Sequence, residues 1–222
     1  MSDYYIPSTC QVEKLNDIYL KYFGYTNKGF FIDVGAYDGF QHSNTWGLAH
    51  ASWEGICYEP IPEYYTKCVQ NHSGHHNIKV IETCIGDREG IVDINVAGTL
   101  STYNDHQLKT EYWKNEYSSS YKITTKITTL NKTLKENNVK QGFEVLSLDV
   151  EGSESDVLKF FDINYWLPKM GIVEVQELHE AQELALQAPF INEYFANAEY
   201  EKIYCDGINN IYVLKEMVGN PC

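Results

Sequence analysis

Short apolar runs, several of which end in an acidic residue, alternate along this sequence with segments of helical periodicity. Such runs are typical of strands that are buried on both faces, as in parallel sheets. They cover residues 29–34, 53–59, 78–85, 143–149 and 171–176. Their alternation with helices predicts an α/β fold in which helices cover both faces of a mostly parallel sheet.

Other patterns complete this arrangement. Apolar residues at helical spacing predict helices over 10–23, 43–51, 62–72, 129–138, 154–161 and 180–198. We expect Thr129 to cap one helix and Pro189 to break or kink another. Residues 91–96 predict a strand with one wet face, and 122–128 an edge-type strand. Residues 200–205 and 210–215 predict a closing antiparallel hairpin.

The chain is long enough for one substantial domain, since it has 222 residues and no linker or repeat. We therefore expect a single domain over 1–222, with residues 1–28 as an N-terminal helical cap. Residues 98–121 are rich in Ser, Thr, Tyr, Asn and Lys and show no clean period. Long loops of this kind in compact domains are often binding loops, so we expect a substrate or lid loop here.

The composition disfavours several classes of partner. With 31 acidic and 17 basic residues the formal charge is −14, and no basic cluster is present, which disfavours nucleic acids and anionic membrane surfaces. No apolar run approaches the length of a membrane span, and the N-terminus does not resemble a signal peptide. No heptad or exposed apolar face indicates an oligomeric state.

The cysteines indicate a reducing compartment. The six cysteines form no CxxC pair, and Cys57 and Cys84 lie inside apolar runs, as is usual for buried free thiols. We therefore expect a cytoplasmic protein. Because the Cys and His spacings fit no zinc-ligand pattern, we expect no zinc site.

A glycine-bearing turn, FIDVGAYDG at residues 31–39, follows the first predicted strand. Gly35 and Gly39 would allow the backbone to approach a ligand closely, because glycine has no Cβ. The turn lacks the GxGxxG pattern of dinucleotide sites, and Asp33 beside it would repel a pyrophosphate. An acidic turn suits a cationic or zwitterionic ligand with an amino group, and S-adenosylmethionine is such a ligand.

Acids also end the next two strands. Glu59 could accept two hydrogen bonds from the vicinal hydroxyls of a ribose, or be an exposed acid at a strand end. Asp87 could accept from an adenine amino group, or be a simple turn residue before Gly90.

A third acidic group follows the last two parallel strands. Asp149 and Glu151 lie at the end of one, and Glu174, Glu177 and His179 at the end of the next. Such a group could bind one divalent cation, Mg²⁺ or Mn²⁺, through oxygen ligands, for which we favour Asp149 and Glu174. Alternatively, it could bind a sugar through hydrogen bonds and abstract its proton. We assign this activation of a hydroxyl to Asp149 and Glu174, with His179 as the alternative base.

Taken together, these motifs resemble the FkbM family of methyltransferases over residues 29–180. The matching stretches are FIDVGAYDG, SNTWGL at 43–48, WEGICYEPIPEYY at 53–65, ITTLNKTL at 127–134, LSLDVEGSE at 146–154 and VEVQ at 173–176. The resemblance implies a Rossmann-like class I methyltransferase fold. It also implies S-adenosylmethionine-dependent O-methylation, often of a sugar or another hydroxylated small molecule.

The resemblance also implies roles for individual positions. In the cofactor loop Tyr37 stands where the family usually has Asn, and Asn44 and Thr45 would help to hold the methionine end. The positions expected at the cofactor are Asp33, Gly35, Tyr37, Gly39, Asn44, Thr45, Glu59 and Asp87. Those expected at the acceptor are Asp149, Glu151 and Glu174, to which we add Glu177 as a further substrate contact.

The sequence therefore predicts an S-adenosylmethionine-dependent O-methyltransferase that acts on a sugar or glycan hydroxyl. Another hydroxylated metabolite is the alternative acceptor. A nicotinamide-dependent oxidoreductase is disfavoured by the absent GxGxxG pattern. A non-catalytic glycan-binding module is disfavoured because acids are retained at all of the strand ends.

Overall fold

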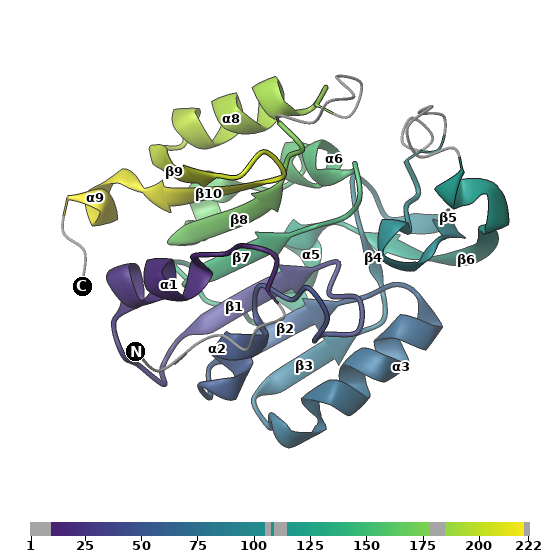
Figure 1. Ribbon diagram of the computed structural model, residues 1–222, viewed down its shortest axis with the longest axis horizontal. Coiled ribbons are helices and arrows are strands. Elements are labelled where there is room, and N and C mark those ends of the chain that lie inside the picture. The colour runs from purple at the N-terminus through teal and green to yellow at the C-terminus, as the bar shows by residue number, and fades with distance from the viewer. Residues whose placement is uncertain (1–9, 105–107, 109–114, 178–184, 220–222) are drawn as a thin grey trace.

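The computed structural model describes residues 10–104, 108, 115–177 and 185–219. Seven strands form the main sheet in the order β3-β2-β1-β7-β8-β10-β9 (Figure 1). Their bounds are Phe30–Val34 for β1, Glu54–Tyr58 for β2, Ile78–Ile81 for β3, Val145–Leu148 for β7, Met170–Glu174 for β8, Tyr200–Cys205 for β9 and Asn209–Leu214 for β10.

The sheet is parallel except at its C-terminal hairpin. β1 pairs in parallel with both β2 and β7, and Asp33 on β1 lies level with Cys57 on one side and Ser147 on the other. β10 runs antiparallel to both β8 and β9. The predicted mostly parallel sheet with a closing hairpin is confirmed.

Helices pack on both faces of this sheet because its strands are apolar on both sides. Phe31 and Ile32 are neighbours on β1, yet they belong to different buried clusters, one on each face. The helices are α1 Leu15–Phe23, α2 Trp46–His50, α3 Pro62–Asn71, α5 Leu130–Glu136, α6 Glu154–Lys159, α7 Ile163–Trp166, α8 Ala188–Asn197 and α9 Lys215–Val218. Among the described residues, no helix has the length and apolar character needed to cross a membrane.

A second, smaller sheet stands at one edge of the molecule (Figure 1). Its order is β4-β6-β5, with β4 at Cys84–Ile85, β5 at Gly90–Val96 and β6 at Tyr121–Thr128. Two predictions are wrong here. The apolar run 78–85 divides at Thr83 into strands of different sheets, and β6 is a central strand. β6 alternates like an edge strand because one of its faces is exposed.

The helix predictions need three corrections. The helix predicted over 10–23 begins only at Leu15, because Cys10 forms an isolated bridge with His42. Pro189 lies in the first turn of α8, where its missing N–H costs no hydrogen bond, so it does not kink the described helix. The short α7 was not predicted. The expected cap is present, since Thr129 Oγ1 accepts from the backbone N–H of Lys132.

Candidate functional site

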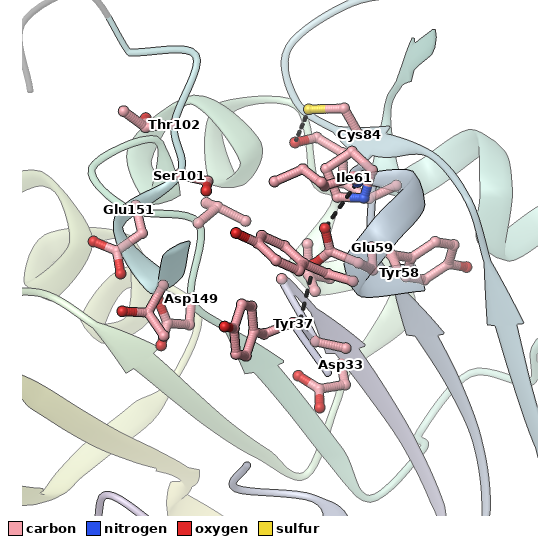
Figure 2. Close-up of a pocket in the computed structure, with 18 of the residues that line it drawn as sticks. Asp33, Tyr37, Tyr58, Glu59, Ile61, Cys84, Ser101, Thr102, Asp149 and Glu151 are labelled. Carbon is pink, nitrogen blue, oxygen red and sulfur yellow. Dashed lines mark hydrogen bonds between the residues drawn. The ribbon is translucent and has the colours of Figure 1, made fainter. Parts of the chain in front are cut away.

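A pocket opens at the carboxyl ends of β1, β2 and β7, where the strand order reverses (Figure 2). Ligands of open α/β sheets bind at such a reversal. The glycine turn, the ends of β2 and β7, the start of β4 and residues from the 98–103 segment line this pocket. These segments are far apart in the sequence, so the pocket exists only in the folded chain.

The glycine turn packs against the residue that follows β7 and forms hydrogen bonds with the end of β2. Gly35 has φ +87°, and a Cβ there would lie 1.7 Å from the carbonyl oxygen of Asp149. The N–H groups of Gly35 and Ala36 both donate to the carbonyl of Tyr58 at 3.1 Å. Gly35 therefore allows β7 to approach the turn closely, whereas the sequence suggested the close approach of a ligand.

Asp33 lies at the bottom of the pocket and is nearly fully buried. Its Oδ2 accepts a hydrogen bond of 2.6 Å from Thr45 Oγ1. Burial raises the pKa of Asp33 to about 6, against the opposing effect of that hydrogen bond. Asn44 lines the pocket, whereas Thr45 does not line it and supports Asp33.

Glu59 presents a fixed carboxylate to the pocket. Its Oε2 accepts from the backbone N–H of Tyr37 at 3.0 Å, and its Oε1 from that of Ile61 at 2.8 Å. Burial raises the pKa of Glu59 to about 8, and these two hydrogen bonds oppose the rise. Each carboxylate oxygen has a second lone pair with which to accept from a ligand hydroxyl.

Two other positions of the predicted cofactor set lie away from the pocket wall. Asp87 pairs with Arg88 at 2.6 Å on the surface and does not line the pocket. Gly39 also does not line it, and contacts Cys68 and His72. Thr83 and Cys84 line the pocket instead. The sequence did not indicate these two residues because the apolar run 78–85 predicts one strand, although a polar threonine inside that run was the available signal.

A compact acidic group lies on the β7 side of the pocket. Carboxylate oxygens of Asp149, Glu154 and Glu174 all lie within 4.8 Å of one another. Burial raises the pKa of Asp149, and burial together with the neighbouring acids raises that of Glu174 well above its usual range. Carboxylates this close cannot all be ionised at the same time unless a cation lies between them. Without a cation, at least one of them holds a proton. Asp149 lines the pocket, whereas Glu174 does not.

Glu154 is a member of this group that was not predicted from the sequence. It is fully buried, and its Oε1 accepts from the backbone N–H of Val150 at 2.8 Å. Its Oε2 accepts from the side chain of Gln187. Its place at the end of the LSLDVEGSE stretch was the available signal, but the same position also predicts the start of a helix.

Glu151 faces Glu59 across the pocket, beside Asp149 (Figure 2). It has φ +52°, a strained value for a residue with a side chain. Its Oε2 is buried and has no hydrogen-bond partner in the described part of the chain. Glu177, which the sequence predicted at the acceptor, does not line the pocket. Glu177 pairs with Lys202 at 2.7 Å outside the pocket lining, and His179 lies outside the described residues.

The buried acids predict a loss of stability as pH rises. The folded state holds protons on Glu59 and Glu154, with pKa values near 8 and 7, that the unfolded chain releases near 4.5. Their contribution is complete below about pH 4.5 and is lost as pH rises through 7 to 8. The free energy of unfolding, measured by urea titration, should therefore fall between pH 6.5 and 8.

Glu59→Gln is the control for this pH dependence, because it removes the titrating group with the highest of these values. We expect a shallower pH slope in this variant. Burial lowers the pKa of His72 from 6.5 to about 4, so the unfolded chain still binds protons at this residue near pH 6.5, and His72 offsets a small part of the fall at the lower end of the window. A wild-type stability that rises over this window would contradict the placement of these acids.

Comparisons with known proteins agree with the fold. The model of the methyltransferase FkbM domain family matches residues 33–202. An FkbM methyltransferase structure from Methylobacillus flagellatus KT aligns with a TM-score of 0.50 at 14% identity, over 87% of this chain and 47% of that one. This chain thus spans about half the length of that protein.

Two further structures show lower scores. A methyltransferase from Geobacter sulfurreducens has 11% identity over 92% of this chain and 80% of its own, with a TM-score of 0.48. A Podospora anserina methyltransferase bound to S-adenosylhomocysteine has 9% identity over 84% of this chain and 72% of its own, with a TM-score of 0.47. No curated protein matches the sequence.

Proposed function

The chain belongs to the FkbM methyltransferase family, and we propose that it transfers the methyl group of S-adenosylmethionine to a hydroxyl oxygen of a sugar or glycan. The observation that carries this proposal is the Glu59 carboxylate. Two backbone N–H groups fix it, and it lies on the pocket wall at the point of strand reversal. This is the position from which an acid can bind the two hydroxyls of a ribose.

The pocket residues fit the different parts of S-adenosylmethionine, which supplies an electrophilic methyl group when bound. Glu59 would hold the ribose, and Thr83 and Cys84 would border the adenine. Asp33 and Asn44 would hold the charged methionine end, since both line the pocket and Asp33 is an acid. The pocket wall is acidic rather than basic, which suits this ligand better than a pyrophosphate.

We assign the acceptor side to Asp149, with Glu174 beside it. A hydroxyl is a poor nucleophile at neutral pH, so a base must take its proton as the new bond forms. Asp149 lines the pocket, and its raised pKa makes it a stronger base than an ordinary aspartate. Glu174 and Glu154 surround it with carboxylate oxygens that can share the acquired proton.

A divalent cation is an extension of the same proposal. Asp149, Glu154 and Glu174 offer oxygen ligands at a separation that one Mg²⁺ or Mn²⁺ could bridge. The buried Oε2 atoms of Glu151 and Glu174 have no hydrogen-bond partner among the described residues, which favours such a ligand. A cation there would lower the pKa of an acceptor hydroxyl and orient it.

The acceptor is a sugar, a glycan or another small hydroxylated metabolite in this proposal. We assign its recognition partly to residues 98–121, because Ser101, Thr102 and Tyr103 of this segment line the pocket. Hydroxyl-bearing side chains suit a polyhydroxylated partner.

Release of S-adenosylhomocysteine, measured over a panel of free sugars, nucleotide sugars and other alcohols, tests this proposal. If no hydroxylated compound in the panel stimulates the release of S-adenosylhomocysteine, the proposal is contradicted.

We also place the protein in a reducing compartment such as the cytoplasm. The five described cysteines, Cys10, Cys57, Cys68, Cys84 and Cys205, are unpaired thiols. Unpaired thiols are usual where glutathione and thioredoxin keep cysteines reduced.

At pH 8.5, where Glu59 with its pKa of about 8 is mostly ionised, Glu59→Gln is expected to weaken the binding of S-adenosylhomocysteine about tenfold to a hundredfold, since hydrogen bonds to charged groups are worth about 1.5–3 kcal/mol. Calorimetric titration of both proteins measures this change. Asp87→Asn is the matched control, because this half-buried acid pairs with Arg88 and lies outside the pocket. Equal losses in the two variants would contradict the assignment of Glu59 to the ribose.

A further inference from the structure

A second cluster of reactive side chains lies between β2 and α3 and takes no part in the pocket. Cys57 on β2, Cys68 on α3 and His72, which follows α3 directly, each offer one donor atom, and these atoms all lie within 4.8 Å of one another. Each side chain is at most 4% exposed. Two sulfurs and one imidazole nitrogen form a donor set that soft transition-metal ions prefer.

We propose that Cys57, Cys68 and His72 form a binding site for a thiophilic divalent cation such as Zn²⁺. Cys57 Sγ lies 4.0 Å from His72 Nε2. Zn–S bonds of about 2.3 Å and Zn–N bonds of about 2.0 Å place such atoms roughly 3.6 Å apart in a tetrahedral site. Cys57 Sγ and His72 Nε2 therefore need to approach one another by only a few tenths of an ångström, and no pair of the three donors is separated by more than 4.8 Å.

His75 prepares His72 for this role. The Nδ1 atoms of the two rings lie 3.0 Å apart, so one of them donates a proton to the other. With this proton on His72, its Nε2 keeps a free lone pair directed toward the thiols. An outer hydrogen-bond partner of this kind is usual for a metal-bound histidine.

The charges balance in the loaded site. Binding forms two Zn–S bonds and one Zn–N bond, breaks two S–H bonds and releases two protons to solvent, with no oxidation or reduction. Two thiolates and a neutral imidazole around a divalent cation give a complex without net charge. A neutral complex avoids the large cost of burying an isolated charge.

Gly39 leaves space at the donor atoms. It has φ +72°, and a Cβ at this position would lie 2.7 Å from Cys68 Sγ and 2.8 Å from His72 Nε2. The absence of that side chain keeps open a point beside two of the three proposed ligands. The three protein ligands leave the fourth position of a zinc ion to a non-protein ligand.

A row of imidazoles leads from the surface to these thiols. His50 is exposed, His75 is partly buried and His72 is buried. The ring centroids lie 5.9 Å apart for His50 and His75, and 5.3 Å apart for His75 and His72. This row offers a cation successive nitrogen ligands on its way inward.

Spacing along the chain could not reveal this site, and the expectation of no zinc site came from spacing alone. The two cysteines lie eleven positions apart, on a strand and on the following helix. Zinc motifs read from sequence depend on ligands that share one short loop or helix. Here the packing of α3 on the sheet brings the sulfurs together.

Titration of the reduced full-length chain with Co²⁺, the probe ion, tests the proposal. We expect one equivalent to produce the charge-transfer absorption of thiolate-bound cobalt, and Zn²⁺ to abolish it. Cys68→Ala and His72→Gln should bind Co²⁺ at least tenfold more weakly. Cys84→Ser, which alters an equally buried thiol outside the cluster, should keep the wild-type signal.

His75→Ala covers the case in which a core variant does not fold, because His75 is partly exposed. Loss of this outer partner should weaken Co²⁺ binding by about 10–100-fold.

Three results would overturn the proposal. They are no thiolate absorption in the reduced wild type, absorption that persists in folded Cys68→Ala, and a Cys57–Cys68 disulfide found by mass spectrometry in chain purified without reductant. None of these readouts depends on methyl transfer.

Discussion

Asp149→Asn is expected to lower kcat for methyl transfer by about 10²–10⁴-fold, the usual contribution of a general base. Asparagine has nearly the same shape as aspartate but cannot take the proton of an acceptor hydroxyl. Binding of S-adenosylhomocysteine should change little, because Glu59 and Asp33 are the residues assigned to bind the cofactor. Steady-state release of S-adenosylhomocysteine, with an acceptor identified from the panel, measures the change.

Two further variants complete this experiment. Glu174→Gln should give a smaller loss, because Glu174 touches the acidic group without lining the pocket. Asp93→Asn alters an exposed acid on β5 and should retain wild-type activity. A nearly unchanged kcat in Asp149→Asn would remove this residue from the chemical step.

Gly35→Ala is expected to destabilise the fold by about 3 kcal/mol or more. The new Cβ would lie 1.7 Å from the carbonyl oxygen of Asp149, and a φ of +87° is strained for alanine. Neither the turn nor β7 can move freely, because β7 is a strand of the central sheet and the turn begins directly at the end of β1. Urea unfolding followed by circular dichroism gives the difference in free energy.

Gly74→Ala is the matched control for this prediction. A Cβ at Gly74 would have no heavy atom within 4 Å, so its stability should change by less than about 1 kcal/mol. If both alanine variants unfold at the same urea concentration, the close contact between the turn and β7 does not exist in solution.

The central sheet could be predicted because its strands are apolar on both faces. Runs such as FFIDV and VLSL have no other stable place than the middle of a parallel sheet. The acids at the strand ends follow from the same logic, since parallel strands bring their carboxyl ends to one edge. For this reason Asp33, Glu59 and Asp149 meet at one pocket, as the sequence suggested.

The remaining features depend on contacts that no periodicity encodes. The break at Thr83 transfers Cys84 to a second sheet and leaves Asp87 on the surface. Glu174 and Glu154 come together only through the packing of β8, α6 and the β7 loop. The need for Gly35 comes from the backbone of Asp149, more than a hundred positions away. Local patterns carry no information about such approaches.

Calorimetric titration with S-adenosylhomocysteine tests the central claim most directly. The proposal predicts saturable one-site binding in the micromolar range, where about 8 kcal/mol corresponds to about 1 μM. It also predicts much weaker binding to Glu59→Gln and no binding of a nicotinamide dinucleotide. Absence of binding heat with folded wild-type protein across several temperatures, or preferential binding of the nicotinamide dinucleotide, would contradict the assignment of this pocket to S-adenosylmethionine.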